Sequence, residues 1–185
     1  MIDVVIKVGG ALLRQPGALD AAARAIAEAA RAHRMLVVPG GGPFADAVRA
    51  ADRQVGLGDD AAHWMAILGM EQYAHLLAER IVGARVVECV EEIERALGAG
   101  CIPVLAPYRW LRAADPLPHA WEVTSDSLAA WVAGAVHART LVLLKPVAGE
   151  TRALVDAYFE RVVPDQARVV VLAASDIDTL AQLLD

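Results

Sequence analysis

The chain has 185 residues, of which 57% are hydrophobic and 22% are charged, so it can bury a sizeable core and is not an intrinsically disordered protein. Its formal net charge of −6 argues against nucleic acid or an anionic membrane as a partner. The mean hydropathy of +0.42 does not reflect a membrane span, because no apolar run reaches the roughly 20 residues that a spanning helix needs.

The N-terminus does not have the pattern of a signal peptide, because the apolar stretch at residues 2–8 is too short and runs into Gly9 and Gly10. We therefore expect one soluble, cytoplasmic domain over residues 1–185. Cys89 and Cys101 have no spacing suited to zinc, so we expect two free, buried thiols and no metal site.

Two apolar strands are predicted near the N-terminus, and glycines follow both. The first strand covers residues 2–8, and the second covers residues 35–38 and is followed by Gly40, Gly41 and Gly42. Helices are predicted at residues 18–33 and 43–53. Glycines after a strand let backbone amides approach phosphate oxygens, although each cluster taken alone fits an ordinary turn about equally well.

A long helix is predicted at residues 59–81, begun by Asp59 and Asp60. Its apolar residues cover more than one stripe, so the helix is expected to be buried on two faces. A homodimer interface through this helix and a central helix of a monomer are both compatible with the pattern.

Four more strands are predicted at residues 86–87, 102–105, 141–144 and 169–172, and helices alternate with them at residues 89–97, 125–137, 152–159 and 176–184. Continuous apolar strands that alternate with helices indicate an α/β fold, a three-layer α/β/α sandwich with a mainly parallel sheet. The proline-containing segment 106–120 is expected to be irregular.

Ligands of open parallel sheets bind beyond the carboxyl ends of the strands. The two glycine clusters lie at such ends, as do Lys7, Lys145 and the segment Thr124-Ser125-Asp126. Lys7 and Lys145 are the only lysines among 17 basic residues, and a compact ammonium group suits a phosphate oxygen. Asp126 is placed either to orient both lysines or simply to cap a helix, and both roles are compatible.

Phosphoryl transfer suits these glycines, lysines and the aspartate, because the reaction needs positioned phosphates and positive charge but little covalent chemistry from the protein. No Walker A sequence, complete G-x-G-x-x-G or G-x-S-x-G motif is present. His63 and His119 are the two histidines of interest, although a structural or surface role is the commoner one for such residues.

The order Lys7-Val8-Gly9-Gly10, Gly40-Gly41-Gly42 and Thr124-Ser125-Asp126 resembles the amino-acid kinase superfamily, with its carbamate kinase-like fold. The segments from Gly40 to Asp46, around His63, and from Trp121 to Trp131 are similar to the small [5-(aminomethyl)furan-3-yl]methyl phosphate kinases of methanogens and methylotrophs. The resemblance implies ATP and Mg²⁺, a small phosphorylated acceptor, a diphosphate product in methanofuran-type cofactor biosynthesis, and a homodimer.

The resemblance also implies roles for individual residues. Lys7 would bridge donor and acceptor phosphates, Asp126 would organise Lys7 and Lys145, and Lys145 would lie on the nucleotide side. The residues implied in binding are Gly9, Gly10, Gly41 and Gly42 for phosphates, and Gly40, Asp46, His63, Thr124 and Ser125 for the acceptor.

The chain departs from the family pattern in its last third. After Lys145 it reads Pro146-Val147-Ala148-Gly149, where relatives carry a Val-Asp-Gly turn, and residues 151–165 are short for a nucleotide-binding half. We expect an acceptor part at about 1–140 and a reduced nucleotide part at about 141–185. A catalytically inactive kinase-fold protein that binds a phosphorylated metabolite or a partner enzyme is the alternative to an active kinase.

Overall fold

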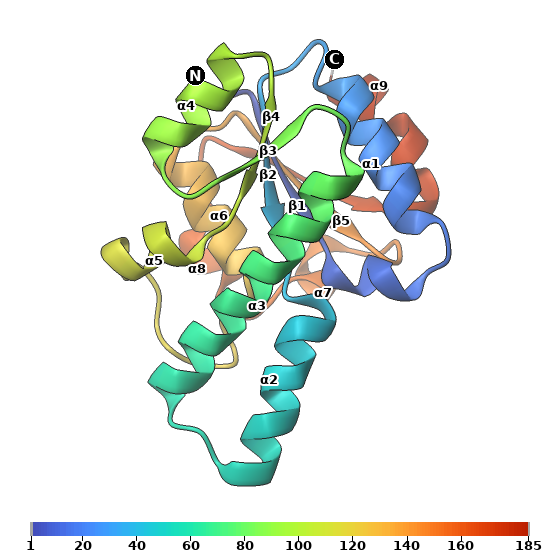
Figure 1. Ribbon diagram of the computed structural model, residues 1–185. Helices are drawn as coiled ribbons and strands as arrows, with labels where there is room; N and C mark the ends of the chain where they lie inside the picture. Colours follow the sequence, from blue (N-terminus) through green and yellow to red (C-terminus); the bar gives the residue numbers. More distant parts are fainter. Residues whose placement is uncertain (1, 185) are drawn as a thin grey trace.

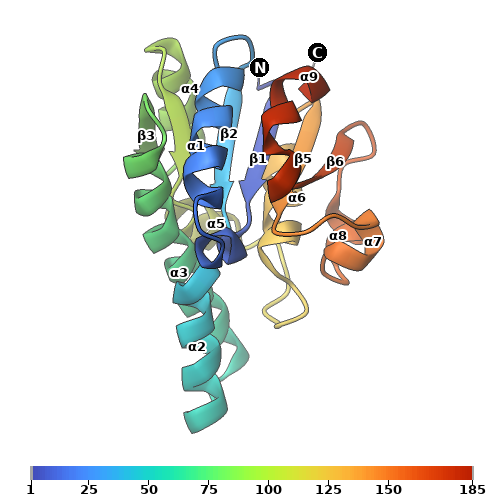
Figure 2. The same ribbon diagram turned by 90° about the vertical axis from the view of Figure 1, so that its right-hand side faces the viewer.

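The computed structural model describes residues 2–184 and contains one six-stranded sheet in which every pairing is parallel (Figures 1 and 2). The spatial order of the strands is β3-β4-β2-β1-β5-β6. The predicted α/β fold with a parallel sheet is therefore confirmed, and all six predicted strands are present. Their bounds are β1 Val4–Val8, β2 Met35–Pro39, β3 Ala84–Val87, β4 Ile102–Leu105, β5 Thr140–Lys145 and β6 Arg168–Ala173.

Helices cover both faces of the sheet because the strand side chains alternate between two apolar cores. Ile6 packs with α1 (Ala18–Ala29), η2 (Ala174–Thr179) and α9 (Leu180–Leu184) on one face. Val5 packs with α4 (Val90–Gly98), α6 (Ser125–Ala135) and α8 (Phe159–Val162) on the other. Figure 1 shows the sheet edge-on between these layers, with α4 and α6 on one side and α1 and α9 on the other. No helix in residues 2–184 is both long and apolar enough to span a bilayer.

The helices α2 (Gly42–Val55) and α3 (Asp59–Arg80) form an antiparallel pair that projects beyond the carboxyl edge of the sheet (Figure 1). They approach closely because Gly69 of α3 lies against the backbone of Phe44 and Ala45, where a Cβ atom at Gly69 would come within 3.0 Å of the Ala45 nitrogen. The buried half of α3 contributes Tyr73 to one core and Met70 to the other, as its two apolar faces predict.

Several local predictions were wrong. The helix α5 (Tyr108–Ala114) lies within the segment expected to be irregular. The single helix expected at 152–159 is instead two short helices, α7 (Thr151–Leu154) and α8, because Asp156 between them bonds to the start of α6. The helix expected at 176–184 begins as the 3-10 turn η2, and the one expected at 18–33 ends at Ala29.

Two smaller expectations are also corrected. Cys89 and Cys101 are free, as expected, but both are half-buried rather than buried. Gly58, not an aspartate, occupies the N-cap position of α3, and Asp59 and Asp60 lie in the first turn, where their charges still complement the helix dipole.

Candidate functional site

The two lysines project from the same face of the sheet. β1 pairs with β5 so that Lys7 lies opposite Leu143, and Lys145 is two residues beyond Leu143. Residues two apart in a strand share a face, and Leu143 belongs to the core beneath α6. Both ammonium groups therefore lie on the α6 side of the sheet, near its carboxyl edge.

The start of α6 brings a carboxylate to these ammonium groups. Thr124 caps the helix by accepting a hydrogen bond from the Asp126 backbone N–H at 3.4 Å. Asp126 Oδ1 then lies 2.9 Å from Lys7 Nζ, and its Oδ2 lies 2.6 Å from Lys145 Nζ. The three residues are only 4%, 4% and 9% exposed, for Lys7, Asp126 and Lys145 respectively. One buried carboxylate thus bridges two buried ammonium groups.

The cluster carries an excess of positive charge. Burial alone would raise the pKa of Asp126, but the neighbouring Lys7 and Lys145 ammonium groups outweigh it and lower that pKa below its usual value. Burial and then the Lys7 charge lower the pKa of Lys145, against the attraction of Asp126. An anion bound here would supply the negative charge that the cluster lacks, so the geometry favours an anion site.

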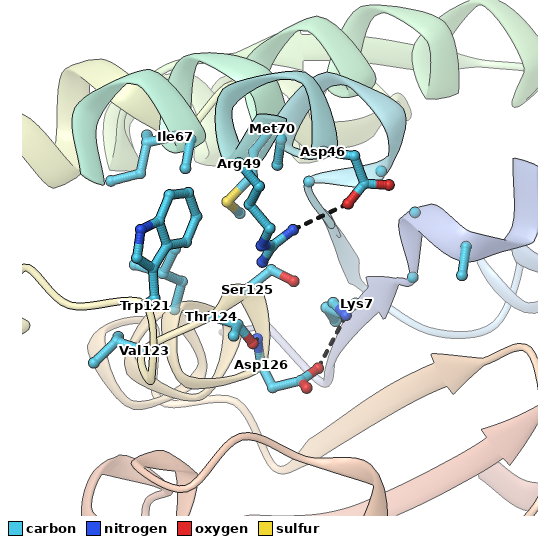
Figure 3. Close-up of a pocket in the computed structure, with 18 of the residues that line it drawn as sticks. Lys7, Asp46, Arg49, Ile67, Met70, Trp121, Val123, Thr124, Ser125 and Asp126 are labelled. Carbon is cyan, nitrogen blue, oxygen red and sulfur yellow. Dashed lines mark hydrogen bonds and ion pairs between the residues drawn. The ribbon is translucent and has the colours of Figure 1, made fainter. Parts of the chain in front are cut away.

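A cavity of about 490 Å³ opens above this cluster, between α2, α3 and the start of α6 (Figure 3). This volume lies within the usual range for small-molecule sites. Figure 3 shows the side chains of Lys7, Arg49 and Ser125 directed into one common space. Pro146, Val147, Ala153 and Leu154 also line the cavity, so the segment after β5 contributes to it.

The two glycine loops pack directly against each other at the edge of the cavity. A Cβ atom at Gly10 would come within 2.1 Å of the Gly42 backbone, so no other residue fits there without a shift of the loops. Gly42 also has φ of +56°, in the left-handed region. Gly10, Gly41 and Gly42 line the cavity, and none of their amides donates to a backbone acceptor in the described residues 2–184.

The expectations for Gly9 and Gly40 need correction. The Gly9 amide donates to the Leu144 carbonyl at 3.0 Å, and the Gly40 amide donates to the Val8 carbonyl at 2.9 Å. Gly9 lines the cavity but Gly40 does not. Their amides extend the strand ladders, so the Gly9 amide is not available to a phosphate and the Gly40 amide is not available to the acceptor.

Thr124 and Ser125 both line the cavity but differ in what their hydroxyl groups do. The Thr124 hydroxyl donates to Asp156 Oδ2 at 2.7 Å, so it serves the local structure instead of an acceptor. The Ser125 hydroxyl makes no hydrogen bond to another residue of the described part of the chain. Ser125 is therefore the better placed of the two to bind a ligand.

Asp156 organises the whole start of α6. Its carboxylate accepts hydrogen bonds from the Thr124 amide at 3.0 Å, and from the amide and hydroxyl of Ser127 at 3.1 and 2.5 Å. It also accepts one from the amide of Tyr158 at 3.1 Å. This carboxylate satisfies the exposed N–H groups of the helix start and so fixes the position of Asp126 one residue away.

Asp46 lines the cavity, as expected for a binding residue, but two arginines already engage it. Arg14 lies 2.5 Å and Arg49 lies 3.2 Å from its carboxylate oxygens. Arg49 also lies over the ring of Trp121, 5.0 Å from its centroid, and the Trp121 indole N–H donates to Asp52 at 2.8 Å. Asp46 therefore positions arginines at the cavity wall.

His63 lines the cavity, while His119 stacks behind it at a centroid distance of 4.1 Å. Burial, and then the charge of His119, lower the pKa of His63 to about 4. The His63 ring is therefore neutral at pH 7.

The described residues do not build a metal site of their own. No group of three or more His, Cys, Asp or Glu side chains within residues 2–184 is placed to hold a metal ion. Asp126 Oδ1 is buried without a hydrogen bond of good geometry in this part of the chain, yet it lies between two ammonium groups that would repel a divalent cation. The Mg²⁺ that the resemblance implies does not fit these carboxylates and would depend on phosphate oxygens for its ligands.

Sequence reasoning missed Arg14, Arg49, Asp59 and Trp121, all of which line the cavity. The spacing of four between Asp59 and His63 was a usable signal, because it places both on one face of a helix. Arg14 and Trp121 follow from the packing of α2 against neighbouring segments, which no local pattern reveals.

Comparison with known proteins identifies the family of this chain. The model of the amino acid kinase family matches residues 4–149. A curated relative, the [5-(aminomethyl)furan-3-yl]methyl phosphate kinase of Methanocaldococcus jannaschii, is 27% identical over 145 residues. The match covers 78% of this chain and 66% of the relative, so the chain spans just under two thirds of that protein's length.

Two solved structures share the fold. The uridylate kinase of Archaeoglobus fulgidus matches with a TM-score of 0.74 and 17% identity, covering 98% of this chain and 96% of that one. The UMP kinase of Ureaplasma parvum matches with a TM-score of 0.72 and 17% identity, covering 95% and 91%. At this identity the likeness concerns the fold alone.

Proposed function

The chain belongs to the amino acid kinase family, and from that premise we propose that it transfers the γ-phosphoryl group of ATP to a small phosphomonoester. The observation that carries the proposal is the cluster of Lys7, Asp126 and Lys145 beside a cavity of about 490 Å³. A non-bridging oxygen of the acceptor phosphate attacks the γ-phosphorus, and the bond to the β–γ bridging oxygen breaks. ADP leaves with that electron pair, and the product is a diphosphate.

The residues of the site have distinct roles in this proposal. Lys7 lies between donor and acceptor phosphates and stabilises the charge of the transition state. Asp126 holds the Lys7 and Lys145 ammonium groups in place, and Lys145 faces the nucleotide side, next to Pro146. The free amides of the glycine loops and the N-terminus of α2 bind phosphate oxygens.

The proposed acceptor is [5-(aminomethyl)furan-3-yl]methyl phosphate, and its diphosphate would serve methanofuran-type cofactor biosynthesis as a good leaving group. The activity of the relative from Methanocaldococcus jannaschii supports this choice. Arg49 and Ser125 line the cavity and suit the acceptor phosphate. Ile67, Met70 and Trp121 offer an apolar wall for a flat ring.

An assay with purified protein, ATP, Mg²⁺ and this phosphomonoester tests the proposal. ADP release and a new diphosphate signal in ³¹P NMR are expected. Lys7→Ala should lower kcat/KM by about two orders of magnitude or more, because transition-state charge stabilisation is lost. Arg31→Ala, in the exposed turn after α1, is the matched control that should change little, and circular dichroism should show that both variants are folded.

A binding protein without catalysis is the second candidate. It is favoured by the small nucleotide side, which consists of the single-turn helices α7 and α8 next to β6. Calorimetry separates the two candidates: a protein that binds the phosphomonoester but neither binds ATP nor releases ADP is a binding protein.

A homodimer through the helix at residues 59–81 remains a proposal as well. Met65 and Leu68 on α3 are 38% and 41% exposed, which is unusual for large apolar side chains near one another on a helix. Light scattering at micromolar concentration tests it, and a mass of one chain that does not rise with concentration would contradict it.

A further inference from the structure

The wall of the cavity formed by α3 is one continuous stripe of the helix. Its members follow the spacing of three and four residues that places side chains on one helical face. The stripe runs from buried Met70 at the inner end to exposed Asp59 at the outer end. The stripe comprises Asp59, Ala62, His63, Ala66, Ile67 and Met70.

His119 lies behind this wall, between two carboxylates that hold its ring in place. His119 Nδ1 lies 2.6 Å from Asp60 Oδ1, and its Nε2 lies 2.9 Å from Asp115 Oδ1. Both ring nitrogens must carry protons to donate to two carboxylates at once, so the contacts favour an imidazolium. In agreement, the hydrogen bond to Asp60 is the main cause that raises the pKa of His119.

Burial is the main reason that His63 is neutral, and this imidazolium reinforces it. The two rings are stacked with an interplanar angle of 18°, so a second positive charge on His63 would lie against the first. Trp64 packs edge-on against both rings and holds the stack together. A neutral imidazole has one nitrogen that can accept a hydrogen bond, and His63 makes no hydrogen bond to any protein group within residues 2–184.

Asp59 supplies a charge one turn further out. It lines the cavity on the same helical face as His63, and within the described part of the chain it has neither a hydrogen bond nor an ion-pair partner. Asp46, by contrast, is engaged by Arg14 and Arg49. Asp59 is therefore the carboxylate of the cavity that is available to a ligand.

The cavity is consequently polarised along its length. At its inner end the two ammonium groups of Lys7 and Lys145 outnumber the single carboxylate of Asp126, so the charge there is positive. Its outer end has Asp59, with Asp60 and Asp115 behind it, against the positive charges of His119 and of Arg112, which lies over the Trp64 ring 4.4 Å from its centroid. An anion is favoured at the inner end and a cation at the outer end.

The spacing along α3 sets the length of a matching ligand. Seven residues separate Met70 from His63, which corresponds to roughly 10 Å at 1.5 Å per residue, and Asp59 lies about 6 Å further out. A ligand that contacts both ends of this wall therefore carries its anionic and cationic groups at opposite ends.

We propose that Asp59 and neutral His63 form a cation subsite that selects acceptors carrying a primary ammonium group at the end opposite the phosphate. The ammonium donates hydrogen bonds to the Asp59 carboxylate and to the unprotonated nitrogen of His63. His119 is a positioning residue that acts through His63. This subsite rests on the proposed phosphotransferase function and names the feature by which that site chooses its acceptor.

The test compares two acceptors, [5-(aminomethyl)furan-3-yl]methyl phosphate and its analogue with a methyl group in place of the aminomethyl group. Wild-type kcat/KM should favour the amine by about 100-fold, as two charge-assisted hydrogen bonds would give. Asp59→Asn and His63→Phe should each reduce this preference about 10-fold. His63→Phe keeps a ring for stacking on His119, and Glu94→Gln on the exposed face of α4 is the charge-matched control that should keep the full preference.

Calorimetry of both acceptors without ATP measures acceptor binding separately from turnover. If the wild type processes both acceptors equally well, or if Asp59→Asn and His63→Phe leave the preference intact, the cation subsite is wrong and the phosphotransferase proposal stands. If neither acceptor binds or reacts, both proposals are overturned. Binding of the amine alone, without turnover, supports the subsite and contradicts the catalytic proposal.

Discussion

The Nζ atom of Lys145 lies 2.6 Å from Oδ2 of Asp126, which joins the end of β5 to the start of α6. Lys7 reaches the other oxygen of the same carboxylate from β1. Three elements that are far apart in the sequence thus meet at one charge. Because the pairs are buried, they are sensitive to the loss of any one partner.

Asp126→Asn should therefore impair both stability and activity. Removing the carboxylate leaves two buried ammonium groups without compensation, at a cost of about 3 to 5 kcal/mol in the free energy of unfolding. We also expect kcat/KM to fall by about two orders of magnitude or more, because both lysines lose their position. Urea unfolding and the ADP-release assay measure the two effects, and a variant of unchanged stability would contradict the ion-pair geometry.

The same carboxylate makes a defined contribution to acid stability. The folded-state pKa of Asp126 is lowered below its ordinary value of 3.8, so its stabilising contribution is complete above that pH. It is lost as the pH falls through the folded-state value. Below pH 4 the stability difference between wild type and Asp126→Asn should therefore shrink, as urea unfolding across that range would show.

Asp156→Asn should weaken the start of α6 while leaving Lys7, Asp126 and Lys145 themselves in place, although it also removes a carboxylate whose charge raises the pKa of Lys145. Asp156 accepts five hydrogen bonds, including two from Thr124 and two from Ser127. We expect a loss of about 2 kcal/mol in stability and a lower kcat, since Asp126 shifts with the helix start. Asp165→Asn, in the loop before β6, is the control that should leave melting temperature and kcat unchanged.

Much of this arrangement could be predicted from the sequence, because it depends on rules of parallel sheets. Apolar runs bounded by glycines predict buried strands, and the carboxyl ends of parallel strands share one edge, so Lys7 and Lys145 had to lie near each other. Asp126 was predicted to approach them from a helix start, and the structure places it there. The roles of these residues in catalysis stay predictions.

The remaining features depend on tertiary contacts that local patterns do not contain. The break between α7 and α8 exists because Asp156 bonds to α6, about 30 residues earlier in the chain. The helix α5 forms in a proline-containing segment because its Leu111 is buried in the core beneath α6. Arg49 enters the site only because α2 leans over the cavity, which its sequence does not specify.

Gly10→Ala should damage the glycine loops. A Cβ atom at this position would come within 2.1 Å of the Gly42 backbone, so the two loops must separate. We expect a loss of about 3 kcal/mol in stability and a large rise in KM for ATP, because the phosphate-binding amides move. Gly98→Ala, whose Cβ atom would meet nothing within 4 Å, should be neutral or stabilising, and thermal unfolding compares the two.

NMR titration should reveal the effect of the His119 charge on the pKa of His63. His119→Gln removes the charge stacked on His63, so the pKa of His63 should rise from about 4 towards its ordinary value of 6.5. Asp115 and Asp60 remain nearby and favour the same direction, while burial still opposes it, so we expect a partial rise.

In the wild type the pKa of His119 itself is raised, so its stabilising contribution is complete below pH 6.5 and is lost as the pH rises through the folded-state value. Carbon-detected titration of the five histidines from pH 3 to 9 follows both rings. A wild-type His63 that titrates near 6.5 would refute the proposed neutral state.

Arg49→Ala should change acceptor binding more than nucleotide binding. Arg49 lines the cavity opposite Ser125 and is held over Trp121 by Asp46, so its guanidinium is preorganised for a phosphate on the acceptor side (Figure 3). The variant should raise KM for the phosphomonoester about 10-fold or more and leave KM for ATP within about twofold. Arg53→Ala, one turn further along α2 and exposed, is the matched control. Equal rises in both KM values would show that Arg49 supports the cavity as a whole, and an unchanged acceptor KM would remove it from the site.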